Sequence, residues 1–435
     1  MTAPLAPTLL RVIDGLVPEL VAFRRDLHAH PELSFQEHRT TARLRERLEA
    51  AGLEPRSVSE TGLVVDLGAS EPRRRVALRG DIDALPVRER TGLDWSSTVD
   101  GACHACGHDV HATALLGAGL ALAEVADELA ARHVAVRLLF QPAEEQMPGG
   151  ALKFVREGVM QGVDTVYAVH CDPSLDVGEI GLREGPLTAA ADQVTVTLRG
   201  RGGHTSRPFL TEDLTYALAK VVTDVPAVLS RRVDPRSGLV VVWGRVSAGE
   251  AINVIPSTGV AQGTLRMLDI ELWEKIGPLL HEVVDDVVRP YGVDAAIEHI
   301  RGVPPVVNDT GAVAALGRAT MAAGMRPVPT PHSLGGEDFA WMLHEAEGAM
   351  ARLGTRTHGG RTFDLHQGDL VVDEGAVRNL AVAIGTPPPR TPVYRPGVSR
   401  SRRPPSPSVS TRISWLKEPT SAGMTSSGQR YCVQP

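Results

Sequence analysis

Three apolar, strand-like runs in the first half of the chain lead directly into side chains that can do chemistry. The runs are Arg75–Gly80, Val134–Phe140 and Val166–Val169, and the stretch His111–Ala131 between the first two has a helical composition. They are followed by Asp81 and Asp83, by Glu144 and Glu145, and by His170. Strands that alternate with helices and collect polar residues at their carboxyl ends are typical of α/β proteins. We therefore expect an α/β domain with a site at one end of its sheet.

The pattern changes from Asp192 onward. Gln193–Leu198 alternates between apolar and polar residues, as a half-exposed strand does. Helical and strand-like segments follow, in the order Leu214–Leu229, Leu239–Val246, Gly259–Met267 and Leu272–Arg289. We predict a first domain in two parts, residues 1–190 and 303–385, with an α+β domain inserted at 191–302. The segment 386–435 is rich in Pro, Ser and Arg, and we expect it to be disordered because it can bury little apolar surface.

The composition excludes several classes of protein. The 435 residues are 43% hydrophobic and 22% charged, which is ordinary for a soluble protein of two or three domains. A net charge of -7 without a dominant basic patch argues against nucleic acid as a partner. No segment has the ~20 apolar residues of a membrane span. The first 21 residues have no secretory signal pattern, so we expect a cytoplasmic protein, and the four cysteines are too few for a disulfide framework.

The stretch Cys103–His111 gathers two thiols, three imidazoles and a carboxylate. Cys106 and His108 flank Gly107, whose backbone freedom lets a thiolate and an imidazole bind one metal ion. A buried cysteine beside a surface histidine is the alternative. Cys103 and Cys106 also form a C-x-x-C pair of the redox or zinc-ribbon type, but no second pair completes a ribbon.

Glu144 and Glu145 follow the apolar run Leu138–Phe140 and the stiff residue Pro142. Adjacent extended residues point in opposite directions, so one carboxylate can bind metal while the other acts as a base toward a substrate. A solvated pair of glutamates is the alternative.

His170 and His366 each end an apolar stretch, where an α/β sheet collects its ligands. A histidine hydrogen-bonded within the core is the alternative for each. Asp81 or Asp83 could orient a ligand histidine, or could simply belong to a turn.

The inserted domain offers three further candidates. His204 lies in the Gly-rich turn Gly200–Ser206, which lacks the spacing of a phosphate-binding loop. Asn253 precedes the apolar segment 254–256, and Arg266 could pair with a carboxylate through two parallel hydrogen bonds. A surface ion pair is the alternative for Arg266.

Taken together, these motifs resemble the peptidase M20 family, in its aminoacylase and amidohydrolase branch. The resemblance covers residues 9–384 and consists of seven ordered motifs. These are Leu27–Ser34, Leu78–Pro86, His104–Asp109, Gln141–Glu145, Gly203-His204, Asn253–Pro256 and Gly336–Phe339. It implies a metallopeptidase-like catalytic domain with a mixed sheet flanked by helices, and an inserted α+β domain that serves as lid and dimerisation domain.

The resemblance also implies roles for particular residues. Two divalent ions (Mn, Zn, Co or Ni) would be held by Cys106, His108, Glu145, His170 and His366. Glu144 would be the general base and Asp83 the carboxylate that orients the site. His204 would stabilise the oxyanion in the active site of the partner subunit of a homodimer. Asn253 and Arg266 would bind substrate.

The expected function is metal-dependent hydrolysis of the amide bond of N-acyl amino acids or related small amides, without nucleic acid or membrane as partners. A dipeptidase, an N-carbamoyl amino acid hydrolase and a non-catalytic metal-binding member of the family are the alternatives. Cys103 stands where this branch commonly has Met, and the Cys171-Asp172-Pro173 context after His170 also departs from the family pattern. Neither Cys103 nor His332 receives a role from the resemblance.

Overall fold

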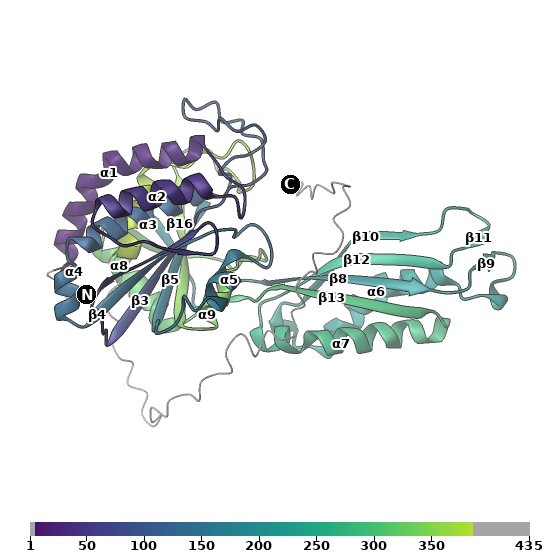
Figure 1. Ribbon diagram of the computed structural model, residues 1–435. Helices are drawn as coiled ribbons and strands as arrows, with labels where there is room; N and C mark the ends of the chain where they lie inside the picture. The colour runs from purple at the N-terminus through teal and green to yellow at the C-terminus, as the bar shows by residue number, and fades with distance from the viewer. Residues whose placement is uncertain (1–4, 386–435) are drawn as a thin grey trace, which may run out of the picture. The chain divides into compact units, whose positions relative to one another are not determined.

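The computed structural model describes residues 5–385, and their contacts divide the chain into two units (Figure 1). The described part of the first unit comprises residues 5–185, 308–330 and 341–385, and the second unit comprises 186–307 and 331–340. In the sequence, the second unit is thus an insertion with a short additional segment at 331–340. The predicted tail at 386–435 lies outside the described residues.

An eight-stranded mixed sheet forms the centre of the first unit. Its strands are β1 (Arg56–Val58), β2 (Gly62–Gly68), β3 (Arg74–Asp81), β4 (Val134–Gln141), β5 (Thr165–Asp176), β6 (Glu179–Leu182), β15 (Arg326–Pro329) and β16 (Glu347–Arg356). They lie in the order β1-β2-β4-β3-β5-β16-β6-β15. The four central strands β4, β3, β5 and β16 are parallel, so their carboxyl ends meet at one end of the sheet.

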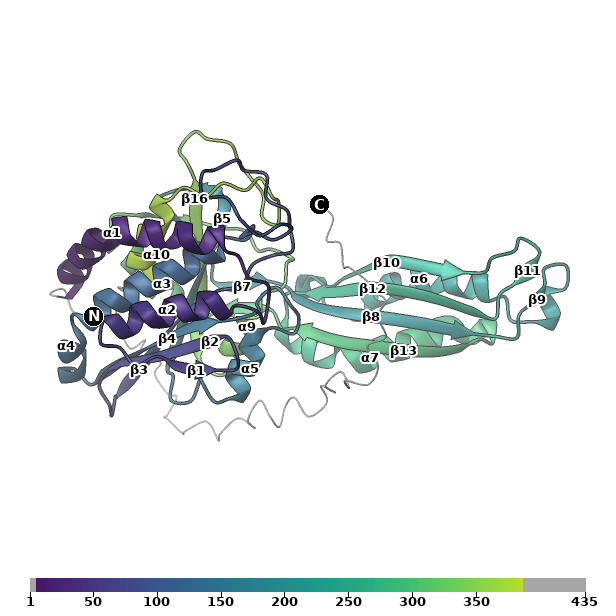
Figure 2. The same ribbon diagram turned by 45° about the horizontal axis from the view of Figure 1, so that its top comes forward.

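Helices pack on one face of this sheet around a shared apolar core (Figure 2). They include α1 (Leu5–Ala29), α2 (His38–Ala50), α3 (His108–Ala123), α8 (Thr310–Ala322) and α10 (Gly375–Gly385). The stretch from His111 to Ala131, predicted as helical, is divided into α3 and α4 (Ala126–Ala131), and the side chain of Val125 between them is buried. Two short helices complete the list for this part of the chain, α5 (Gly150–Arg156) and α9 (Ala340–Leu343).

The second unit is a four-stranded antiparallel sheet with two helices. Its strands β8 (Ala190–Arg199), β10 (Val240–Ala248), β12 (Thr258–Met267) and β13 (Asp294–Val303) lie in the order β10-β12-β8-β13. Helices α6 (Leu214–Arg232) and α7 (Ile270–Val288) pack against this sheet. The buried carboxylate of Asp192 joins the layers, because it accepts hydrogen bonds from Trp273 Nε1 on α7 at 2.9 Å and from His299 Nε2 on β13 at 2.8 Å.

Shorter elements complete the second unit and its boundaries. These are the strands β7 (Gly185–Thr188), β9 (Gly203–His204), β11 (Val254–Ile255) and β14 (Val306–Asn308) and the 3-10 turns at Pro208–Leu210, Pro235–Ser237 and Arg289–Tyr291. The predicted fold class, a mixed sheet flanked by helices together with an α+β unit, is confirmed. Within residues 5–385, no helix combines the length and the apolar character that crossing a membrane requires.

The turn after β4 is held by a buried carboxylate. Ala143 has a left-handed backbone (φ 54°), which is uncommon for a residue with a side chain. Its N–H donates to Glu37 Oε1 at 2.8 Å, and the hydroxyl of Thr61 donates to Glu37 Oε2 at 2.7 Å. Burial outweighs these hydrogen bonds and raises the pKa of Glu37 to about 7. The Glu37 side chain thereby holds the backbone immediately before Glu144. Its raised pKa means that folding favours the protonated form of its carboxyl group.

This titration predicts a pH dependence of stability. A carboxyl group whose pKa is raised on folding stabilises the fold fully below its unfolded pKa and loses that contribution as the pH rises through the folded pKa. From the shift of 4.5 to about 7, the wild type should lose up to about 3 kcal/mol relative to Glu37→Gln between pH 4.5 and pH 7.5. Urea unfolding of both proteins in chelator across this range measures the difference, and parallel stability curves would contradict it.

Candidate metal centre

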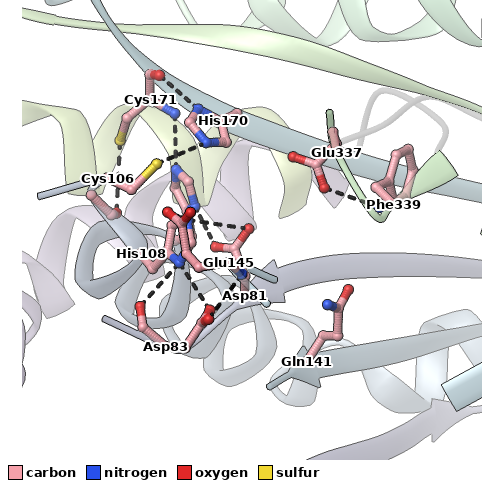
Figure 3. A network of polar contacts seen from close by, with 12 residues as sticks. Asp81, Asp83, Cys106, His108, Gln141, Glu145, His170, Cys171, Glu337 and Phe339 are labelled. Carbon is pink, nitrogen blue, oxygen red and sulfur yellow. Dashed lines mark hydrogen bonds and ion pairs between the residues drawn. The ribbon is translucent and has the colours of Figure 1, made fainter. Parts of the chain in front are cut away.

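Six donor side chains form one continuous cluster in the first unit. Figure 3 shows four of them, Cys106, His108, Glu145 and His170. Cys106, His108 and His170 offer ligand atoms within 4.8 Å of one another. The same spacing holds for Cys106 with Glu145 and His366, and for His108 with Glu144 and Glu145. The structure therefore brings together all five residues predicted to bind metal, and it adds the predicted base to the same group.

The loop before α3 delivers Cys106 and His108 through a glycine turn. Gly107 has a left-handed backbone (φ 82°), and a Cβ at this position would lie 2.8 Å from the sulfur of Cys171. Only glycine combines this backbone with this close approach. The turn lets Cys106 and His108, which begins α3, contribute to one cluster although they are two residues apart.

Hydrogen bonds fix the protons of two ligand histidines on the ring nitrogen away from the cluster. Nδ1 of His108 lies 3.0 Å from the carbonyl oxygen and 3.1 Å from the carboxylate of Asp83. Nδ1 of His170 lies 2.7 Å from the carbonyl oxygen of Cys171. These oxygens can only accept, so each Nδ1 carries the proton and each Nε2 turns a lone pair into the cluster.

The Nε2 atoms of His108 and His170 and the carboxylate of Glu145 have the surroundings expected of metal ligands. Nε2 of His170 faces the sulfur of Cys106 at 3.3 Å. Among the described residues, buried Nε2 of His108 has no hydrogen-bond partner, and it lies 3.9 Å from Oε1 of Glu145. A buried polar atom without a partner is rare in proteins, and a cation shared with Glu145 would satisfy Nε2 of His108. The donor set thus fits a metal ion.

Electrostatics in the cluster likewise favour a bound cation. Burial and the charges of Glu145 and Glu144 raise the pKa of the Cys106 thiol well above its usual range. Burial would lower the pKa of His108, but the nearby carboxylates of Asp81, Asp83 and Glu145 raise it to about 10. Cys106 and His108 therefore both hold protons in the absence of a metal ion. A metal ion that binds here displaces these protons, so metal binding releases protons.

His366 joins the cluster from the other end of the sequence. Its backbone is left-handed (φ 61°), and its N–H donates to the carbonyl of Ala105 at 2.8 Å. This bond ties its turn to the loop that carries Cys106. Nε2 of His366 lies 3.3 Å from Oε1 of Glu145, and the side chain is 39% exposed.

Asp83 organises three parts of the site at once. Besides His108, it accepts hydrogen bonds from the hydroxyl of Ser34 at 2.6 Å and from the backbone N–H of Glu145 at 3.1 Å. Burial alone would raise the pKa of Asp83, but these partners, chiefly His108, hold it below its usual range. Asp83 is therefore an ionised carboxylate that orients both a ligand histidine and the Glu145 backbone.

His111 is a residue of the site that the sequence analysis did not assign. Its Nδ1 meets the carboxylate of Asp81 at 2.5 Å, and its Nε2 accepts the backbone N–H of Cys171 at 2.9 Å. With both ring nitrogens engaged, His111 has no lone pair left for a metal ion. It instead packs between His108 and His170, with ring centroids 5.4 Å and 5.1 Å away, and supports both.

The cysteines near the cluster are separate thiols. Cys103, Cys106 and Cys171 are all buried and free. Burial raises the pKa of Cys103 to about 12, so it remains a neutral thiol packed beside Leu85 and Cys106. This argues against the C-x-x-C redox interpretation. His332 is exposed in the second unit.

The second unit separates the other predicted residues into two groups. His204 and Asn253 are neighbours, because β9 pairs with β11 and the N–H of Thr205 donates to the carbonyl of Asn253 at 3.2 Å. They lie beyond the end of β12 at which Thr258 pairs with Arg199, whereas Arg266 pairs with Ala191 at the other end. Eight residues of strand span about 26 Å. One chain therefore does not bring Asn253 and Arg266 together.

His204 is prepared to donate a hydrogen bond. Its Nδ1 lies 3.1 Å from the backbone N–H and 2.8 Å from the hydroxyl of Ser206. A backbone N–H can only donate, so Nδ1 accepts and the proton sits on the exposed Nε2. Arg266 donates through Nη1 to the carbonyl oxygen of Leu334 at 2.5 Å.

Comparison with known proteins identifies relatives over most of this chain. It is 46% identical over 362 residues to a Rhodococcus jostii (strain RHA1) protein named "Putative glutamate--cysteine ligase 2-3", a match that covers 82% of this chain but only 45% of that protein. It is 37% identical to the N-acyl-L-amino acid amidohydrolase of Geobacillus stearothermophilus, over 74% of this chain and 88% of that protein.

Solved structures and a family model agree with these relatives. A dinuclear metal binding peptidase from the M20 family of Bacillus subtilis matches with a TM-score of 0.74 and 32% identity, covering 86% of this chain and 98% of that one. The model of peptidase family M20/M25/M40 matches residues 77–380. The predicted family is thereby confirmed: this chain belongs to peptidase family M20/M25/M40.

Proposed function

We propose that this chain hydrolyses the amide bond of N-acyl amino acids at a centre of two divalent metal ions. The observation that carries the proposal is the continuous cluster of six donor side chains in which His108 and His170 both turn Nε2 inward. The name of the Geobacillus relative and the dinuclear description of the Bacillus structure support the same activity.

The metal ligands of the proposal are Cys106, His108, Glu145, His170 and His366. A set of thiolate, imidazole and carboxylate donors accepts Mn, Zn, Co or Ni, and availability decides among them. Metal bound here lowers the pKa of a coordinated water and polarises the amide carbonyl. Asp83 and the carbonyl of Cys171 fix the tautomers of His108 and His170, and His111 packs against both rings.

Glu144 is the proposed general base. It is 7% exposed, and a carboxylate oxygen lies within 4.8 Å of ligand atoms of both His108 and Glu145. From this position it takes the proton of the attacking water and delivers it to the leaving amine. The hydrogen bond between Glu37 and the preceding residue, Ala143, holds the turn in place.

His204 and Arg266 serve the substrate in the proposal, and they come from different copies of the chain. Arg266 pairs with the carboxylate of the amino acid, and Nε2 of His204 donates to the amide oxygen as negative charge develops there. A small substrate cannot span the length of β12. If both residues act on one substrate, His204 and Asn253 must reach the site of a second copy.

The surface of the second unit supports such a dimer. Strand β10 is an edge strand, and Val240, Val242 and Val246 on it are 38%, 55% and 50% exposed. Near His204, Phe209 and Ile252 are exposed as well. Apolar residues on an unpaired edge are a liability in a monomer and are typical of an interface between copies.

The first prediction from this function concerns substrate and base. Metal-reconstituted protein should release free amine from N-acyl amino acids faster than from dipeptides or N-carbamoyl amino acids, and chelator should abolish the release.

Glu144→Gln should lose about 10²- to 10⁴-fold in kcat and keep its metal, because a base but not a ligand is removed. Glu145→Gln is the matched control, which should lose metal. Near-full turnover by Glu144→Gln would refute the assignment of Glu144 as the general base.

The second prediction concerns the thiolate ligand. Cys106→Ala should lose bound metal by elemental analysis and should release about one proton fewer when metal is added, as measured by calorimetry in buffers of different ionisation enthalpy. Cys103→Ala, which removes a buried thiol three positions away, is the control and should match the wild type. Unchanged metal content in Cys106→Ala would remove Cys106 from the ligand set.

The third prediction concerns the dimer. His204→Ala and Glu144→Gln should each be nearly inactive alone. Coexpressed, they should recover about a quarter of wild-type activity, because half of the dimers then contain one intact composite site. A mixture no more active than its parents would place His204 in its own chain's site or outside catalysis.

The exposed edge strand β10 offers a separate test of the dimer. Val242→Lys should weaken the dimer in light scattering, whereas Ile300→Lys, on the opposite edge strand β13, should not.

A further inference from the structure

Arg352 lies beside the ligand histidine His170 in the central sheet. The two residues are paired in register on the parallel strands β16 and β5. The neighbours of both residues along their strands point into the helix-covered core: Val169, Cys171, Ala351 and Leu353. Because successive side chains alternate between the faces of a sheet, Arg352 and His170 share the other face. Neighbouring strands are about 4.8 Å apart, so the long Arg352 side chain can reach the space beside the cluster.

The Arg352 side chain is a half-buried cation without a protein partner. Among residues 5–385, no hydrogen bond or ion pair is formed by its guanidinium. Arg356, four positions along the same strand, pairs with Asp176 at 2.6 Å, and Arg326 on β15 pairs with Glu179. A partly desolvated arginine that lacks such a carboxylate is an uncommon arrangement unless a ligand supplies one.

The sheet makes room for this side chain on its other flank. Gly181 of β6 is paired with Arg352, and a Cβ at Gly181 would lie 3.0 Å from Cβ of Arg352. The side chain of Arg352 therefore has room on the face of the sheet that it shares with the ligand His170.

We propose, on the basis of the function proposed above, that Arg352 binds a second carboxylate of the substrate. Arg266 pairs with the carboxylate that every N-acyl amino acid carries. The planar guanidinium of Arg352 offers a further fork of donors that matches a carboxylate in two parallel hydrogen bonds. The preferred substrates are then dicarboxylates, with the second carboxylate either in the acyl group or in the side chain of the amino acid.

Substrate ratios test this proposal. The kcat/KM of N-acetyl-L-glutamate and that of N-succinyl-L-leucine are each divided by that of N-acetyl-L-leucine. In Arg352→Gln and Arg352→Met, at least one ratio should fall about 10- to 100-fold, mainly through KM. The ratio that falls identifies which part of the substrate carries the second carboxylate. Arg318→Gln, an exposed arginine on α8, is the matched control for the lost charge.

A binding measurement separates this proposal from the proposed function. Calorimetry with glutarate and metal-loaded protein should give a dissociation constant about tenfold higher for Arg352→Gln than for the wild type. If the wild type cleaves no N-acyl amino acid but glutarate binding still depends on Arg352, only the proposed function fails. If both ratios and glutarate binding are unchanged in folded, metal-loaded Arg352 variants, the second-carboxylate site is refuted.

Discussion

The buried hydrogen bonds of Asp83 are the constraint on which the rest of the site depends. Asp83 follows β3 and bonds to His108 at the start of α3, to Ser34 in the connection between α1 and α2, and to the backbone of Glu145 after β4. Three segments far apart in the sequence thus meet at one carboxylate. Because Asp83 can only accept, it also decides which nitrogen of His108 faces the cluster.

The cluster holds protons that a cation has to displace. Burial and neighbouring carboxylates keep Cys106 protonated, and nearby carboxylates keep a proton on His108. Metal therefore competes with protons for these ligands, and its affinity rises with pH. His111 lies at the centre of this arrangement with both nitrogens engaged, and it therefore acts as a rigid spacer between two ligands.

The proposed substrate-binding residues of the second unit lie at opposite ends of its sheet. His204 and Asn253 lie at one end of β12, and Arg266 lies at the other. Under the proposed function, catalysis would depend on assembly, because a second copy would have to supply His204 and Asn253 to a site that uses Arg266. The proposed second-carboxylate site would add the cation of Arg352, which lies on β16 of the first unit.

Local patterns in the sequence predicted the α/β and α+β units and marked candidate ligands with alternatives, because strand ends and the Cys106-Gly107-His108 turn are encoded by neighbouring residues. The resemblance to the M20 family then selected the ligand set. The sequence could not reveal His111, since a histidine inside a helical stretch has no visible partner until Asp81 and Cys171 are brought to it. It also could not reveal that Glu37 accepts a hydrogen bond from the backbone of Ala143. The separation of Asn253 from Arg266 by β12, and the pairing of Arg352 with His170, were equally hidden. Such relations depend on strand register and on contacts across more than a hundred residues, which only the tertiary structure decides.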